Sequence, residues 1–108
     1  MDILRERINI RDNWYYNLYI GYDKGIYSAH CDIMQVDGIC CHHFQYGYGY
    51  KATLLVVNRR SKKHDAEAIE EYKAVKNKLM ELAMGEAVRN GFTASSSESM
   101  DKAIELCR

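Results

Sequence analysis

The 108-residue sequence contains no proline, no internal repeat and no long apolar run. Without a proline-rich or low-complexity linker, the chain offers no boundary between domains, and its length suits one domain with a small core. The first residues lack the apolar segment of a signal peptide, and no stretch approaches membrane-spanning length. We therefore expect a single cytosolic domain, 1–108, with no membrane partner.

An excess of either charge is also missing, because 15 lysines and arginines balance 15 aspartates and glutamates. A neutral molecule exerts no overall attraction on nucleic acid or on an anionic membrane, so either partner would require a local patch. The sequence contains four cysteines. In the cytosol thiols stay reduced, and we expect these cysteines to be free.

The composition changes near residue 60. Eight of the nine tyrosines lie between Tyr15 and Tyr50, together with many β-branched residues, which favours a sheet. Alanine, glutamate, lysine, leucine and methionine dominate the rest, which favours helix. Strands followed by helices, rather than alternating with them, predict an α+β fold.

Four strands are predicted within a sheet that spans 13–58, at 14–21, 26–34, 39–46 and 50–58. Turns at 23–25 and 36–38 connect successive strands closely, which indicates an antiparallel meander. The segment 1–12 forms either an N-terminal arm or a fifth, edge strand around Ile8 and Ile10.

The second half predicts a long helix over 62–91 and a short C-terminal helix over 95–108, both packed on one face of the sheet. The apolar residues of the long helix recur at steps of three and four and form one stripe: Ala68, Tyr72, Val75, Leu79 and Leu82. Gly91 is placed to end this helix as a left-handed cap.

One helical layer covers only one sheet face, yet the 14–21 strand has large residues on both. Trp14 and Tyr16 share one face, and Tyr15 and Tyr19 share the other. An uncovered aromatic face is typical of an interface with a protein partner or a second copy. The alternative is that tyrosine simply suits a half-exposed sheet. The candidate binding residues are Trp14, Tyr16, Tyr19, Tyr27, Tyr46, Tyr48, Tyr50, Arg59 and Arg60.

Three of the four histidines and three of the four cysteines lie between His30 and His43. A hairpin joining 26–34 to 39–46 would place four metal-capable side chains on one face: His30, Asp32, Cys41 and His43. Zinc sites usually use pairs two to four residues apart at turns, which this pattern does not match. We therefore predict no metal and no cofactor, and a mainly structural cluster in which Cys31 packs opposite His30 and His43. A metal- or thiol-dependent enzyme is the alternative.

A basic cluster precedes the long helix and comprises Arg59, Arg60, Lys62 and Lys63. With the Gly47–Tyr50 loop, which partly matches an RNA-recognition pattern, it suggests a nucleic-acid binder. The acidic residues that follow cancel the cluster locally, and the short turn at 23–25 leaves no room for the helix that the RNA-recognition fold requires.

No enzyme motif is found, so the leading expectation is a small non-enzymatic interaction module that binds through a tyrosine-rich sheet face. In composition, this small, neutral, proline-free, tyrosine-rich chain resembles accessory proteins of phages and mobile elements. That resemblance implies an inhibitor that occludes a host protein.

Overall fold

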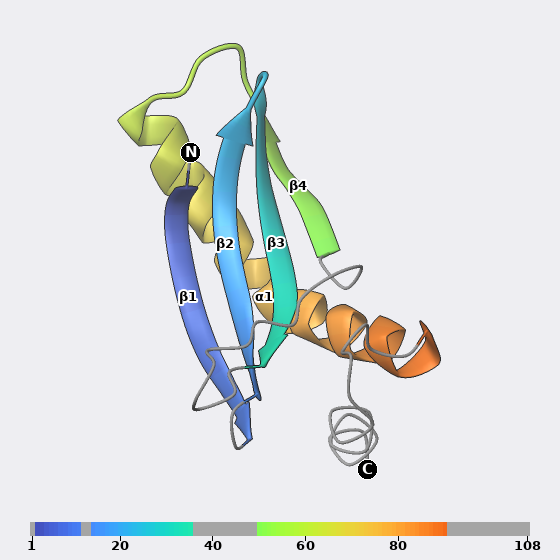
Figure 1. The fold of residues 1–108 in the computed structure, drawn as a ribbon. Coiled ribbons are helices and arrows are strands. Elements are labelled where there is room, and N and C mark those ends of the chain that lie inside the picture. Colours follow the sequence, from blue (N-terminus) through green and yellow to red (C-terminus); the bar gives the residue numbers. More distant parts are fainter. Residues whose placement is uncertain (1, 12–13, 36–49, 91–108) are drawn as a thin grey trace.

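Alternating apolar and polar residues in the first half of the chain form strands, and the alanine- and glutamate-rich second half forms a long helix. The computed structural model describes residues 2–11, 14–35 and 50–90. Its elements are β1 (Asp2–Arg11), β2 (Trp14–Asp23), β3 (Ile26–Gln35), β4 (Tyr50–Val56) and α1 (Lys62–Asn90). The strands form one antiparallel sheet in the order β1-β2-β3-β4, and α1 crosses one face of it (Figure 1).

This arrangement confirms the predicted α+β fold, an antiparallel sheet followed by a long helix. The edge strand expected around Ile8 and Ile10 is present as β1. The predicted 39–46 strand, the Gly91 cap and the 95–108 helix lie outside the described residues.

One predicted strand pairing is wrong. From Ile26 to Cys31, β3 pairs with β2 on one side and with Val56 to Tyr50 of β4 on the other. Each strand has only two hydrogen-bonding edges, so the 39–46 segment cannot be the hairpin partner of β3 over this stretch. Cys41 and His43 lie outside the described residues, so their grouping with His30 stays a prediction.

The turn predicted at 23–25 is present between β2 and β3. Lys24 and Gly25 have φ values of 47° and 86°, the left-handed pair of a two-residue hairpin turn. The Gly25 carbonyl accepts a hydrogen bond from Val57 N–H at 2.9 Å. A Cβ at Gly25 would lie 3.3 Å from the Val57 carbonyl oxygen, so glycine suits both the turn and this close approach.

The core lies between α1 and the sheet. Its largest buried side chains on the sheet are Trp14, Leu18, Ile20, Tyr27 and Ile33. The helix contributes mainly small residues, and its buried stripe consists of Ala68, Tyr72, Leu79, Ala83 and Ala87. Residues of the sheet therefore supply most of the side-chain volume between α1 and the sheet.

The helix stripe follows the predicted spacing except at Leu82, which is 40% exposed. Each residue turns an α-helix by about 100°, and the buried stripe continues from Leu79 through Ala83. Leu82 is rotated by about 100° from Ala83 and by about 60° from Leu79, and it therefore lies at the margin of the stripe.

Polar contacts fix α1 against three strands. Tyr27 of β3 donates a hydrogen bond to Asp65 Oδ1 at 2.5 Å, and Tyr72 donates to Glu6 Oε1 of β1 at 2.6 Å. Tyr50 of β4 donates to Glu86. Each tyrosine places its ring beside the apolar core and its hydroxyl on a carboxylate of the facing element.

The helix begins with a side-chain cap. Ser61 Oγ accepts a hydrogen bond from His64 N–H at 3.0 Å, and the Ser61 carbonyl accepts one from Asp65 N–H at 2.8 Å. These contacts satisfy backbone donors that a helix N-terminus otherwise leaves unpaired.

The bond between Tyr72 and Glu6 predicts a measurable coupling. Lys76 Nζ also lies 3.3 Å from Glu6 Oε1, and Tyr72 is almost fully buried, so the carboxylate is held by both partners. In a cycle of Tyr72→Phe, Glu6→Gln and the double variant, we expect a coupling free energy of about 1.5 kcal/mol, typical of a hydrogen bond to a charged group.

Urea unfolding of the four proteins measures this coupling. The matched control is the exposed pair Lys73 and Glu70, 3.2 Å apart on the outer side of α1, for which we expect no measurable coupling because solvent screens it. Equal coupling in both cycles would contradict an anchoring role for Tyr72.

Candidate binding surface on the open sheet face

The sheet face opposite α1, here called the open face, is built by strand alternation. In β1 the side chains of Leu4, Glu6 and Ile8 belong to the helix side, so those of Arg5 and Arg7 belong to the open face. No other described element covers this face (Figure 1). Its central members are Arg5, Arg7, Tyr15, Asn17, Tyr19, His30, Asp32 and Lys51.

One row of these residues crosses all four strands. Arg5 pairs in register with Tyr19, Tyr19 with His30, and His30 with Lys51. The imidazole of His30 stacks on the Tyr19 ring with centroids 4.6 Å apart and planes 6° from parallel. The Arg5 guanidinium carbon lies 5.1 Å from the Tyr19 centroid. Since β1 and β3 flank β2, the arginine and the histidine approach this ring from opposite sides.

A second stack lies further along the same strands. The Arg7 guanidinium carbon is 3.9 Å from the centroid of the Tyr15 ring, within contact distance for a cation on an aromatic face. Tyr15 is buried, whereas Arg7 is exposed. The tyrosine therefore acts as a support on which a solvent-accessible guanidinium is positioned.

On the open face, acidic side chains are less available than basic ones to contact a binding partner. Asp2 contacts Arg5 at 2.5 Å and is occupied by that ion pair. Burial raises the pKa of the half-buried Asp32 carboxyl, while Arg5 and a hydrogen bond with Tyr19 oppose the increase. Arg7 and Lys51 belong to no ion pair within the described part of the chain.

His30 is neutral at physiological pH. Burial lowers the pKa of its imidazole below 6.5, and the neighbouring Lys51 lowers it further, while Asp2 acts in the opposite direction. The ring nitrogen Nε2 lies 3.1 Å from Ser28 Oγ. His30 thus belongs to the open face as a flat, uncharged group between Tyr19 and Lys51.

Several predicted binding residues do not lie on an open surface. Trp14 and Tyr27 are 1% and 0% exposed and belong to the core beneath α1. Tyr16 is partly buried on the helix side, where it pairs with Ile33, and Tyr50 is engaged with Glu86. Of the predicted tyrosines, only Tyr19 lies on the open face within the described residues; Tyr46 and Tyr48 lie outside them.

The first strand contributes the residues that sequence reasoning missed. Arg5 and Arg7 alternate with Leu4, Glu6 and Ile8, a period of two that is typical of a half-buried strand. Treating this segment as a full strand would have placed both arginines opposite Tyr15, Asn17 and Tyr19. Lys51 could have been found in the same way, from its alternation with Tyr50 and Ala52.

The predicted metal candidates are only partly described. His30 and Asp32 share the open face, two residues apart on β3, while Cys41 and His43 lie outside the described residues. Within the described ranges, no three histidine, cysteine, aspartate or glutamate side chains are grouped closely enough to hold a metal ion.

Cys31 lies on the opposite side of β3 from His30 and is fully buried, as the sequence predicts. Burial raises the pKa of its thiol from 9.0 to about 12, and Asp32 adds to the increase. A thiol that stays protonated and has no access to solvent cannot serve as a nucleophile. Cys31 is therefore a core residue.

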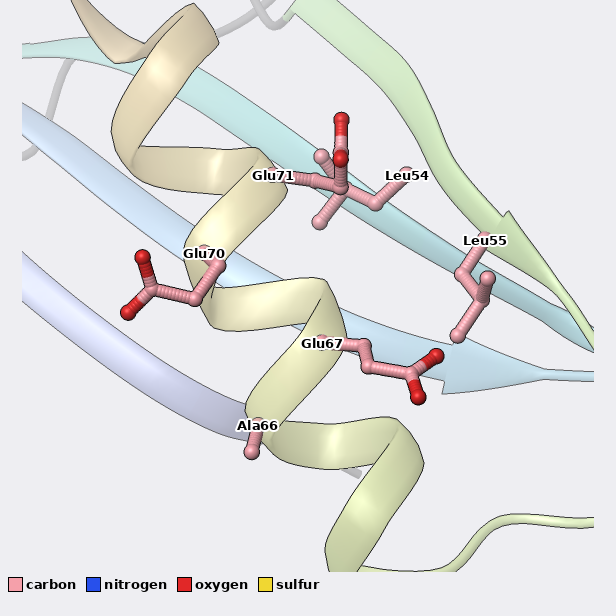
Figure 2. Close-up of a pocket in the computed structure, with 6 residues that line it drawn as sticks. All are labelled: Leu54, Leu55, Ala66, Glu67, Glu70 and Glu71. Carbon is pink, nitrogen blue, oxygen red and sulfur yellow. The ribbon is translucent and has the colours of Figure 1, made fainter.

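An acidic groove lies on the other side of the molecule, between β4 and α1 (Figure 2). It has a volume of about 400 Å³ and is lined by Leu54, Leu55, Ala66, Glu67, Glu70 and Glu71. Glu70 is paired with Lys73 at 3.2 Å. The leucines belong to β4 and the glutamates to α1, so the groove has an apolar side and an acidic side.

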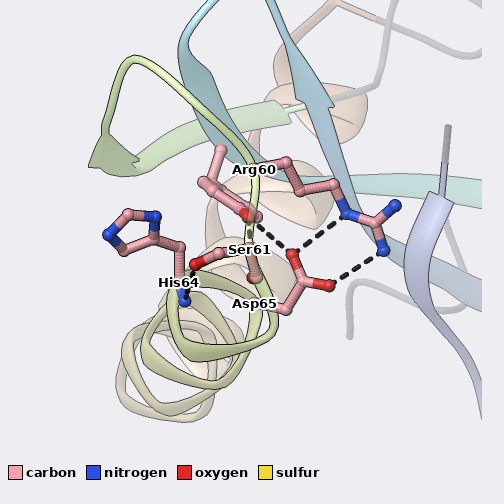
Figure 3. A network of polar contacts seen from close by, with 5 residues as sticks. Arg60, Ser61, His64 and Asp65 are labelled. Atoms are coloured by element: carbon pink, nitrogen blue, oxygen red, sulfur yellow. Dashed lines mark hydrogen bonds and ion pairs between the residues drawn. The ribbon is translucent and has the colours of Figure 1, made fainter.

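The basic cluster before α1 is partly used for structure (Figure 3). Arg60 Nε lies 3.1 Å from Asp65 Oδ1 and its terminal nitrogen 2.8 Å from Oδ2, a two-point contact. These bonds and the one from Tyr27 hold the pKa of Asp65 below its usual range. All four predicted basic residues are exposed, and Arg60 differs from the other three in its contact with Asp65.

Comparisons with known proteins add no relative: no protein-family model, curated protein or solved structure matches the chain. Within the described residues, no helix combines the length and apolar character that a membrane span requires.

Burial of Cys31 predicts a pH dependence of stability. The unfolded thiol releases its proton near pH 9, while the folded thiol keeps it until about pH 12. The contribution of the thiol to the free energy of unfolding is therefore fully present below about pH 9 and decreases as the pH rises above that value. At about pH 10, one pH unit above the pKa of the unfolded thiol, the free energy of unfolding has decreased by roughly 1 kcal/mol.

Chemical unfolding of the parent and Cys31→Ala at about pH 7 and pH 10 tests this, because other ionising groups cancel in the comparison. We expect the parent to lose more stability than the variant over that interval. Equal losses would contradict the burial of the thiol.

The proximity of Lys51 predicts an effect on His30. Removing this cation in Lys51→Met should raise the pKa of the imidazole towards 6.5, while the larger effect of burial keeps it below that value. NMR titration of the histidine ring protons measures the pKa, and Lys62→Met, at an exposed lysine of α1, is the control. An unchanged pKa in Lys51→Met would contradict the cross-strand arrangement.

The same shift gives a second observable. Since the folded imidazole has the lower pKa, the unfolded state binds the proton first as the pH falls. His30 therefore makes the protein less stable as the pH drops below 6.5.

Proposed function

We propose that this protein is a non-enzymatic binding module that engages a protein partner through its open face. The observation that carries the proposal is the row of Arg5, Tyr19, His30 and Lys51, which crosses all four strands. The first three of these side chains are stacked on one another. Arginine and tyrosine are enriched at protein interfaces and at the residues that dominate binding energy.

The stacks also reduce the cost of binding. A long arginine side chain normally loses rotamer freedom when it contacts a partner, which opposes association. Arg5 and Arg7 already lie against aromatic rings in the free protein. Part of the rotamer entropy of these arginines is therefore lost on folding. A partner then binds to side chains that are already positioned.

Nucleic acid is less well supported as the partner. Arg60 is engaged with Asp65 and Tyr50 with Glu86, so two members of the predicted nucleic-acid surface have structural roles. Two members of the cluster on which the alternative metal- or thiol-dependent enzyme depends are otherwise engaged, because His30 is stacked on Tyr19 and Cys31 is buried.

The proposal predicts that charge reversal on the open face abolishes partner binding. In affinity purification from the source cells, we expect a tagged parent protein to retain a specific partner and the double variant Arg7→Glu, Lys51→Glu to lose it. Both residues are exposed, so the fold should persist, which circular dichroism and urea unfolding can check.

The matched control is the double variant Lys73→Glu, Lys78→Glu, which makes the same charge change on the exposed side of α1. A partner lost equally from both variants, or retained by both, would contradict the proposal. Sedimentation of the parent at high concentration distinguishes a second copy from a different protein. Identification of the partner also tests inhibition by occlusion, since that mode of action requires the bound partner to lose an activity.

A further inference from the structure

Building on the proposed binding role of the open face, we infer that its partner is an acidic polypeptide segment, with one carboxylate held by Arg7 and another by Lys51. These two exposed cations lie on β1 and β4 at opposite ends of the strand order. Neither is neutralised by a carboxylate within the described part of the chain.

Arg7 has the geometry for carboxylate recognition. Its guanidinium lies on the Tyr15 ring at 3.9 Å, and the N–H groups of a guanidinium lie in its own plane, directed away from a ring beneath it. Two parallel N–H groups match the two oxygens of a carboxylate and form a two-point contact. Support from Tyr15 thus leaves the recognising edge of Arg7 available.

The spacing of the two cations suits an extended chain. Three strand spacings of about 4.8 Å and an offset of two residues along the strands separate the backbone positions of Arg7 and Lys51 by roughly 16 Å, and these long side chains can lean towards each other to shorten the distance between their charged groups. Residues four apart in an extended peptide are separated by roughly 13 Å and point to the same side. An extended segment that crosses the strands can therefore present carboxylates at positions i and i+4 to Arg7 and Lys51.

The centre of the face favours polypeptide over nucleic acid. Single-stranded nucleic acid usually binds a sheet by stacking its bases on aromatic rings. Tyr15 is buried beneath Arg7, and Tyr19 lies between Arg5 and His30, so neither ring offers a free face to a base. The Asp32 carboxyl group on β3 lies between the strands that carry the two cations, and it opposes a continuous phosphate backbone more than separate carboxylates that contact only Arg7 and Lys51.

The test uses three synthetic probes and the folded full-length protein. The first is a capped serine- and glycine-based peptide of about ten residues with glutamates at every fourth position, long enough to cross the sheet. The second has glutamine in place of each glutamate, and the third is a thymidine oligonucleotide of similar length. Amide chemical shifts from two-dimensional NMR report affinity and location together.

We expect the glutamate peptide to shift amides of all four strands, including those around Arg7 in β1 and Lys51 in β4, and the glutamine peptide to bind at least tenfold more weakly. Arg7→Lys keeps the charge but removes the two-point contact, and we expect it to weaken binding of the glutamate peptide about tenfold. The control Arg59→Lys makes the same change at an exposed arginine outside the sheet and should leave the affinity unchanged.

Three results would overturn the inference. Equal affinity for the two peptides would show that carboxylates are not recognised, and an unchanged affinity in Arg7→Lys would remove the role of the two-point contact. Tighter binding of the oligonucleotide would favour nucleic acid. The proposed function fails separately, when the purified protein retains no partner that depends on the open face.

Discussion

The position of α1 depends on hydrogen bonds between tyrosines and carboxylates at the margin of the core. The helix buries mainly alanine, and small side chains alone provide few steric features to fix where a helix lies along a sheet. The bonds at Asp65, Tyr72 and Glu86 tie it to β3, β1 and β4 over 21 residues, roughly 30 Å of helix. A displacement by one turn would break all three and leave partly buried polar groups without partners, which is costly.

Anchoring the helix on one face separates two roles among the tyrosines of the described strands. On the helix side, Tyr27 and Tyr50 use their hydroxyls to bind carboxylates and their rings to extend the core. On the open face, Tyr15 and Tyr19 instead carry arginines on their rings. Strand parity alone separates the two roles, because successive residues point to opposite faces.

How far the sequence predicts this protein depends on whether a feature is local. The 23–25 turn, the alternation of β2 and β3, and the periodicity of α1 all extend over a few neighbouring residues, and each was predicted. The pairing of β3 with β4 joins segments that are distant in sequence, and composition carries no signal for which strands become neighbours.

The candidate surface was harder to predict for a related reason. Of the predicted binding residues, Tyr19 lies on the face that α1 leaves uncovered, whereas Trp14 and Tyr27 lie beneath α1, and strand alternation alone does not tell which face the helix covers. Arg5 and Arg7 were missed because a charged segment scores poorly as a strand by residue preference. Its alternation becomes meaningful only when β1 is paired with β2.

Strand β1 connects stability with binding. Glu6 anchors α1 through Tyr72, while its sequence neighbours Arg5 and Arg7 project to the open face and lie on the tyrosines of β2. Since β1 stands at one end of the strand order and pairs only with β2 in the described sheet, loss of the Glu6 contact removes its main link to the helix. Any displacement of β1 that follows moves both guanidiniums relative to their rings. The position of the exposed arginines is thus set in part by a carboxylate on the opposite face of the same strand.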